Sequence, residues 1–208
     1  MSMPHGKFKL LLSDIGGVLG TNGWDSHVRR TVCQHFGLME SEIAERHRLM
    51  FDSYERGYMT FEEYLRRVFF GSPRPFNIEE VRDLTYTQSV PWPENIAFFR
   101  RVKQANEVKL GLISNEGEGI TAYRVDKFKL RELADFMIVS HCVHMRKPDR
   151  SIWQLAVDLA QVAPRDCLYI DDRVMFVDIA SQMGFTAVQH VSLESTAEQF
   201  KNFGLKTA

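Results

Sequence analysis

The feature that most constrains the fold is a short apolar run that stops at an acidic residue and a pair of glycines. The run extends from Phe8 to Leu12, and Asp14 and the pair Gly16-Gly17 follow it. It is too short for a typical helix and almost uniformly apolar, which is typical of a strand buried on both faces of a sheet. Open parallel sheets bind their ligands beyond the carboxyl ends of the strands. We therefore expect the chemistry of this protein to depend on Asp14.

Size and composition exclude several classes of function. The 208 residues are 44% hydrophobic and 25% charged, which is ordinary for one α/β core with a smaller accessory domain. The formal net charge of -1 provides no field that would attract nucleic acid or an anionic membrane. No apolar stretch is long enough for a transmembrane helix, and residues 1–7 lack the apolar segment of a signal peptide. We predict a cytoplasmic protein, a monomer or homodimer, without a nucleic-acid or membrane partner, that begins with a short disordered lead-in.

The cysteines and histidines show no metal-binding pattern. Cys33, Cys142 and Cys167 are an odd number without metal-ligand spacing, so we expect reduced, buried thiols. His141 and His144 lie close together but lack a second pair of ligands at a recognised spacing, and we expect no metal there.

The apolar pattern changes along the chain from helices alone to alternating helices and strands. Helical periodicity, proline breaks and a capping-box signature at Thr60-Phe61-Glu62-Glu63 predict helices at 26–36, 42–54, 60–70 and 78–89. The next segments predict helices at 94–105, 120–133, 150–161, 174–183 and 194–203, with strands at 109–114, 136–140, 167–170 and 186–189. This alternation indicates a parallel sheet with right-handed crossovers. The predicted fold is α/β: a Rossmann-like parallel sheet with helices on both faces (residues 1–20 and 93–208) and a small inserted all-helical cap domain (residues 21–92).

Polar groups follow four of the predicted strands. All of them should meet at one edge of the sheet, because parallel strands share the edge at which they end. They are Asp14 after the first strand, Ser114-Asn115 after the second, Lys147 before the helix that follows the third, and Asp171-Asp172 after the fourth.

Such a set suits phosphoryl transfer. A carboxylate can attack phosphorus, and paired carboxylates attract Mg2+, which prefers one or two carboxylates with phosphate oxygens and water. A hydroxyl and an ammonium can hold the phosphoryl oxygens, and the backbone N–H groups of the Gly16-Gly17 turn can line the same anion site.

Each motif alone has a structural explanation. An aspartate after a strand can cap the next turn, Ser114-Asn115 can cap a helix, and a lysine is most often solvated. Asp171-Asp172 is the hardest to explain without chemistry, because adjacent like charges at the end of a buried strand are unfavourable unless a cation offsets them.

Taken in order, the four motifs resemble those of the haloacid dehalogenase-like (HAD) hydrolase superfamily, which also carries a helical cap between the first and second motifs. The resemblance covers almost the whole chain. It implies that Asp14 is the nucleophile and a Mg2+ ligand, and that Ser114 and Lys147 hold the phosphoryl group and offset its charge. The metal site would be completed by Asp172, by the backbone carbonyl of Gly16 and by Asp171 as a ligand or an outer partner, and Gly17 and Asn115 are the predicted substrate-binding residues.

The sequence departs from the superfamily pattern at Gly16, where phosphatases usually carry a second aspartate that protonates the leaving group. Losing a positioned acid–base group costs roughly a hundred- to ten-thousand-fold in rate. Asp25, His27 and Glu116 are candidate replacements, since each lies on a loop that can reach the site.

We predict a Mg2+-dependent phosphatase that acts on a small phosphorylated metabolite, with sugar phosphates among the candidates, through an aspartyl-phosphate intermediate on Asp14. Two alternatives stay open: a dehalogenase-like hydrolase that uses an aspartyl ester, and a weak or inactive binding protein of the same fold.

Overall fold

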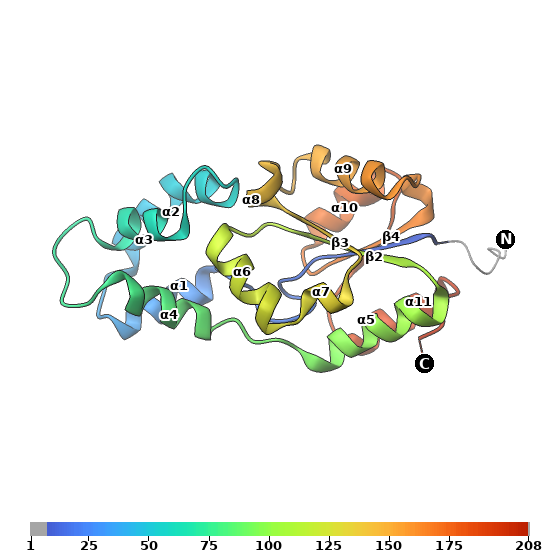
Figure 1. The fold of residues 1–208 in the computed structure, drawn as a ribbon, viewed down its shortest axis with the longest axis horizontal. Helices are drawn as coiled ribbons and strands as arrows, with labels where there is room; N and C mark the ends of the chain where they lie inside the picture. The colour runs from blue at the N-terminus through green and yellow to red at the C-terminus, as the bar shows by residue number, and fades with distance from the viewer. Residues whose placement is uncertain (1–7, 208) are drawn as a thin grey trace.

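A single parallel sheet organises the structure, a computed structural model that describes residues 8–207 (Figure 1). The lead-in predicted at residues 1–7 lies outside the described residues. The strands run in the order β3-β2-β1-β4-β5. Their bounds are β1 (Leu10–Ser13), β2 (Lys109–Ser114), β3 (Phe136–Val139), β4 (Cys167–Asp171) and β5 (Thr186–Gln189). Because β1 is central and pairs with β2 and β4, the residue that follows it lies between the ends of both neighbours.

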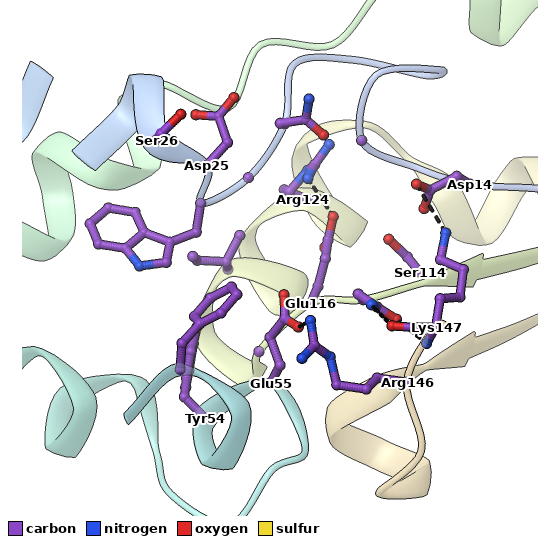
Figure 2. A pocket seen from close by; sticks show the side chains of 18 of the residues that line it. Asp14, Asp25, Ser26, Tyr54, Glu55, Ser114, Glu116, Arg124, Arg146 and Lys147 are labelled. Carbon is purple, nitrogen blue, oxygen red and sulfur yellow. Dashed lines mark hydrogen bonds and ion pairs between the residues drawn. The ribbon is translucent and has the colours of Figure 1, made fainter. Parts of the chain in front are cut away.

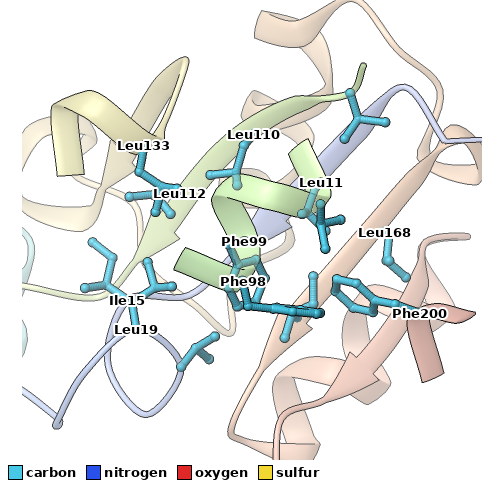
Figure 3. Close-up of a cluster of buried hydrophobic side chains, with 14 of the residues drawn as sticks. Leu11, Ile15, Leu19, Phe98, Phe99, Leu110, Leu112, Leu133, Leu168 and Phe200 are labelled. Atoms are coloured by element: carbon cyan, nitrogen blue, oxygen red, sulfur yellow. The ribbon is translucent and has the colours of Figure 1, made fainter. Parts of the chain in front are cut away.

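Helices cover both faces of this sheet, as predicted. Successive side chains of a strand point to opposite faces, so Leu11 packs in one hydrophobic cluster and Leu10 and Leu12 in another. The first cluster includes side chains of α5 (Pro93–Asn106), α7 (Leu130–Leu133) and α11 (Leu193–Asn202), among them Phe98, Phe99 and Phe200 (Figure 3). The second includes side chains of α9 (Arg150–Ala160) and α10 (Val174–Gln182), among them Trp153 and Phe176.

The residues between β1 and α5 form a helical insertion with a hydrophobic cluster of its own. Its helices are α1 (Ser26–His35), α2 (Glu40–Glu55), α3 (Phe61–Phe69) and α4 (Ile78–Thr87), and they gather at one end of the molecule (Figure 1). The predicted capping box at Thr60 is present. Ile120 of α6 (Glu118–Lys127) belongs to this cluster, so α6 packs against the insertion. The exact boundaries of a core domain and a cap domain stay a prediction.

Three expectations about local structure are wrong. The predicted helix at 120–133 is two helices, α6 and α7, because the backbone turns left-handed at Lys129 (φ 54°). The predicted strand at 136–140 is too long, because β3 ends at Val139 and a four-residue helix, α8 (Ser140–Val143), directly follows it; a 3₁₀ turn, η1 (Pro164–Asp166), precedes β4. Cys33 and Cys167 are buried free thiols as expected, but Cys142 is exposed.

Within residues 8–207, no helix combines the length and the apolar character needed to cross a membrane.

Candidate active site

Asp14 lies at the centre of the sheet edge, where β1 ends. Its N–H donates to the carbonyl of Ile170 on β4 (2.9 Å), and its Oδ1 accepts from the N–H of Ile15 (2.8 Å). The residue is only 7% exposed. Burial raises the pKa of Asp14, Lys147 opposes the rise and Asp171 adds to it. The strand ending therefore positions a carboxylate whose charge depends on its partners.

Lys147 is the main partner of Asp14. Its Nζ lies 3.1 Å from Oδ2 of Asp14 (Figure 2) and 2.6 Å from Oδ2 of Asp171, and the residue is 1% exposed. Burial alone would lower the pKa of Lys147, but the attraction of Asp14 and Asp171 outweighs it and raises the pKa. The ammonium therefore stays charged between the two carboxylates, and its role toward a phosphoryl group stays a prediction.

Residues at the end of β2 hold these groups in place. Ser114 is buried, and its side chain hydrogen-bonds to Asp14, which lowers the pKa of that carboxyl. Asn115 accepts a hydrogen bond from the N–H of Lys147 at Oδ1 (2.8 Å) and donates from Nδ2 to its carbonyl (2.7 Å). The observed contacts of Asn115 position the lysine, and its binding of substrate stays a prediction.

The acidic pair after β4 divides into two different environments. Both oxygens of Asp171 are occupied: Oδ2 accepts from Lys147 and from the Tyr169 hydroxyl, and Oδ1 accepts from the N–H of Arg173 (2.9 Å). In contrast, Oδ1 of Asp172 is buried and has no hydrogen-bond partner in the part of the chain that the structure describes. Burial and the nearby Asp14 and Asp171 raise the pKa of Asp172 to about 6.

These carboxylates fit a divalent cation. One oxygen from each of Asp14, Asp171 and Asp172 lies within 4.8 Å of the others. Oδ1 of Asp172 is the unpartnered one among residues 8–207, and an unpartnered buried carboxylate oxygen beside two like charges is the arrangement that a cation relieves. Mg2+ is the cation expected, because it keeps several ligand positions for water and phosphate.

The two glycines after Asp14 allow this close packing. A Cβ at Gly17 would lie 2.3 Å from a carboxylate oxygen of Asp172, and the φ of +69° also favours glycine. A Cβ at Gly16 would lie 2.6 Å from Oδ1 of Asn22. The Asn22 side chain therefore occupies the space into which a side chain at position 16 would extend.

A cavity of about 290 Å³ lies between this edge and the helical insertion. Asp14, Gly16, Ser114, Asn115 and Lys147 line it, so most of the predicted site residues surround one space (Figure 2). The residues that line it from the insertion are Asn22, Gly23, Trp24, Asp25, Ser26, Arg29, His47, Phe51, Tyr54 and Glu55. Arg124, Arg146 and Arg173 add positive charge, which suits an anionic ligand.

The three candidate replacements for an acid at position 16 differ in position. His27 is exposed on α1 and does not line the cavity. Asp25 lines it but caps α1, where its Oδ1 accepts from the N–H of Val28 (2.9 Å). Glu116 lines it but forms a buried ion pair with Arg124. The roles of all three stay predictions.

The sequence analysis missed Glu55 and Arg146, which also face the cavity. Glu55 is the last residue of α2, where its negative charge opposes the helix dipole. An acid at this position is a weak signal that some other contact stabilises the carboxylate. Arg146 directly precedes Lys147, and its Nη2 lies 2.5 Å from Oε2 of Glu55. Their pairing depends on how the insertion packs, which no local pattern reveals.

Comparison with known proteins shows what the chain and its fold are similar to. A curated flavin mononucleotide hydrolase of Arabidopsis thaliana, described as chloroplastic, is 24% identical over 174 residues, which is 83% of this chain and 70% of the relative. A HAD family enzyme of Bacteroides thetaiotaomicron, solved with magnesium and inorganic phosphate, superposes with a TM-score of 0.78 at 20% identity, over 93% of this chain and 99% of that one. L-2-haloacid dehalogenase of Xanthobacter autotrophicus, solved with chloropropionic acid covalently bound, superposes with a TM-score of 0.61 at 17% identity. The superposition covers 96% of this chain and 84% of the dehalogenase chain.

The family comparison covers most of the chain. Residues 29–189 match the model of the haloacid dehalogenase-like hydrolases, and the span includes Ser114, Lys147 and the acidic pair. The fold has the parallel sheet and the inserted helices expected of such an enzyme. The chain belongs to the haloacid dehalogenase-like hydrolase family.

Proposed function

We propose that the protein is a Mg2+-dependent phosphatase that acts on a small phosphorylated metabolite. The observation that carries this proposal is the convergence of Asp14, Lys147 and Asp172, where a nucleophile and an ammonium lie beside a carboxylate that needs a cation. The positive charge around the cavity supports an anionic substrate. The related fold solved with magnesium and phosphate supports the same choice.

The side chains of this site suit in-line attack on phosphorus. Asp14 would attack the phosphorus atom and form an aspartyl phosphate, while Ser114 and Lys147 hold the phosphoryl oxygens. Water would then hydrolyse the aspartyl phosphate and restore Asp14. When bound by Asp14, Asp172 and the carbonyl of Gly16, Mg2+ would supply the positive charge that offsets the phosphoryl oxygens.

The proposal is tested with a panel of phosphate esters. p-Nitrophenyl phosphate, sugar phosphates and flavin mononucleotide are supplied with Mg2+ or with EDTA. We expect turnover of at least one ester that requires Mg2+, and a loss of at least about a thousandfold in Asp14→Asn, because the amide is a poor nucleophile. Asp178→Asn removes an exposed acid of α10 and should keep full activity.

Other outcomes would favour the alternatives. Turnover of 2-haloacids without Mg2+ would support an aspartyl-ester mechanism, but that chemistry leaves Asp172 without a purpose at the site. Binding of Mg2+ and phosphate without hydrolysis of any ester would support a binding protein instead.

A further inference from the structure

Position 16 provides no proton donor, so an efficient phosphatase of this kind needs one from elsewhere. The Asn22 side chain occupies the neighbouring space, and its carboxamide does not act as an acid. The remaining candidates are the other carboxyl groups that line the cavity. They are Asp25, Glu55 and Glu116.

Glu55 differs from the other two in its hydrogen bonding. Asp25 accepts from the backbone of α1, and Glu116 is paired with Arg124, which also donates to the Thr21 carbonyl (2.7 Å). Oε2 of Glu55 has no hydrogen-bond partner among residues 8–207, although Nη2 of Arg146 lies 2.5 Å away. That contact is an ion pair without hydrogen-bond geometry, so it does not commit the carboxyl group as a hydrogen-bond acceptor.

The placement of Glu55 suits a group that meets the substrate from the far side. It ends α2 and is 6% exposed, and Figure 2 shows its side chain extending into the cavity that separates it from Asp14. In-line attack puts the leaving oxygen opposite the nucleophile. The insertion therefore carries a buried carboxyl group on the side to which the leaving group must depart.

We propose that Glu55 is a catalytic residue that donates a proton to the leaving oxygen of the substrate. The inference rests on the proposed phosphatase function. In the first step an oxygen of Asp14 bonds to phosphorus, the bond from phosphorus to the leaving oxygen breaks, and that oxygen takes the proton of Glu55. In the second step the Glu55 carboxylate takes a proton from water, the hydroxide oxygen bonds to phosphorus, and the bond from Asp14 to phosphorus breaks. The products are the alcohol and inorganic phosphate, with both carboxyl groups restored.

The charges around Glu55 support this role. Burial raises the pKa of Glu55 to about 7, and Glu116 adds to the rise, while Arg146, Arg173 and Lys147 oppose it. A group with a pKa near the working pH is half protonated there, so it can give and take a proton in successive steps.

The experiment compares kcat/KM for p-nitrophenyl phosphate and phenyl phosphate in the wild type and in Glu55→Gln. p-Nitrophenolate leaves without a proton, but phenolate is a stronger base and needs one. We expect Glu55→Gln to change kcat/KM for p-nitrophenyl phosphate by less than about threefold and to lower it for phenyl phosphate about tenfold to a hundredfold. The fall of wild-type kcat/KM for phenyl phosphate above pH 7 should disappear in the variant.

Asp52→Asn is the matched control. Asp52 lies on the same helix and pairs with Arg146 (3.1 Å), but it does not line the cavity. A merely structural role of Glu55 in holding Arg146 would make the two variants behave alike, so an equal leaving-group effect in Asp52→Asn would overturn the proposal. An equal loss on both esters in Glu55→Gln, or no loss, would also overturn it.

Further controls separate the possible failures. Thermal melting shows whether Glu55→Gln is folded. If it is not, Glu55→Asp replaces it, because this variant keeps an acid and should show an intermediate leaving-group effect. A Glu55→Asp variant without any leaving-group effect would count against the proposal. A wild type that hydrolyses no ester of the full phosphate panel would refute the phosphatase function itself, whereas an active wild type with an unaffected Glu55→Gln would refute only the role of Glu55.

Discussion

At the residue scale, the position of the buried Lys147 ammonium depends on a neutral side chain. Lys147 lies in a connection after α8, and Asn115 hydrogen-bonds to both its N–H and its carbonyl. The lysine backbone is therefore anchored to the end of β2, next to Ser114. Side chains that orient catalytic groups in this way matter for rate even when they do not touch the substrate.

Asn115→Ala should therefore lower kcat more than its loss of stability suggests. We expect kcat to fall about tenfold to a hundredfold and the free energy of unfolding to fall by about 1–3 kcal/mol. Steady-state kinetics on a phosphate ester that the wild type hydrolyses measure kcat, and urea unfolding measures the free energy of unfolding.

Asn106→Ala is the matched control, because Asn106 makes the same pair of bonds to the backbone of Lys206 (2.8 and 2.9 Å) outside the cavity. It should lose stability without losing kcat. A loss of kcat in Asn106→Ala equal to that in Asn115→Ala would show that the effect is a general consequence of weaker folding.

The residues at the strand ends could be predicted from sequence, and Glu55 of the insertion could not. Asp14 follows β1, Ser114 and Asp171 are the last residues of β2 and β4, and parallel pairing brings such positions to one edge whatever the helices do. Glu55 reaches the cavity only through the packing of α2 against the rest of the molecule. Its direction depends on long-range contacts, which leave no periodic signal in the sequence.

At the element scale, the insertion is held by a buried polar chain as well as by apolar packing. The indole N–H of Trp24 donates to the hydroxyl of Tyr64 on α3 (2.8 Å). The hydroxyl of Tyr64 also hydrogen-bonds to Nδ1 of His47 on α2 (2.7 Å), and the tautomer of the imidazole decides which of the two groups donates. These hydrogen bonds join α2, α3 and the loop that precedes α1.

The burial of His47 makes the stability of the insertion sensitive to acid. Burial, and then the nearby Arg29, lower the pKa of His47 from 6.5 to about 4. Between these values the unfolded chain binds a proton that the folded protein does not, so the stability that neutral His47 contributes is present above pH 6.5 and lost as the pH falls towards 4. The urea midpoint of the wild type should exceed that of His47→Asn at pH 7.5, and the difference should shrink at pH 5.

Groups that titrate in both proteins cancel in this comparison. His27→Asn changes an exposed histidine of α1 and is the control. The difference between its urea midpoint and that of the wild type should be the same at pH 5 as at pH 7.5. A constant difference for His47→Asn across the pH range would mean that the chain does not respond to protonation.

The elements themselves were predictable where the local signals were strong. The capping boxes at Thr60 and Asn77 and the proline after Trp92 mark helix starts that lie close to the predicted ones. The break at Lys129 was missed because a lysine carries no local signal for a left-handed backbone. The four residues of α8 are too few to show a helical period.

At the scale of the whole molecule, the site opposes folding until a cation binds. Three carboxylates from two neighbouring strands share the edge with one ammonium, and Oδ1 of Asp172 has no partner. The repulsion acts on β1 and β4 together, which are central strands of the sheet. A cation that binds only the folded protein would therefore raise the stability of the entire fold.

Asp172→Asn tests this coupling. In EDTA the variant should melt about 2–4 °C higher than the wild type, which corresponds to roughly 1 kcal/mol for a chain of this size, because a like charge is gone. Mg2+ should raise the melting temperature of the wild type. At a Mg2+ concentration a hundred times the dissociation constant, the free energy of unfolding should rise by about 2.7 kcal/mol. The variant should lose most of that gain, since it lacks the carboxylate with the unpartnered oxygen. Asp178→Asn should respond to Mg2+ as the wild type does, and an equal Mg2+ response in Asp172→Asn would mean that the cation binds elsewhere.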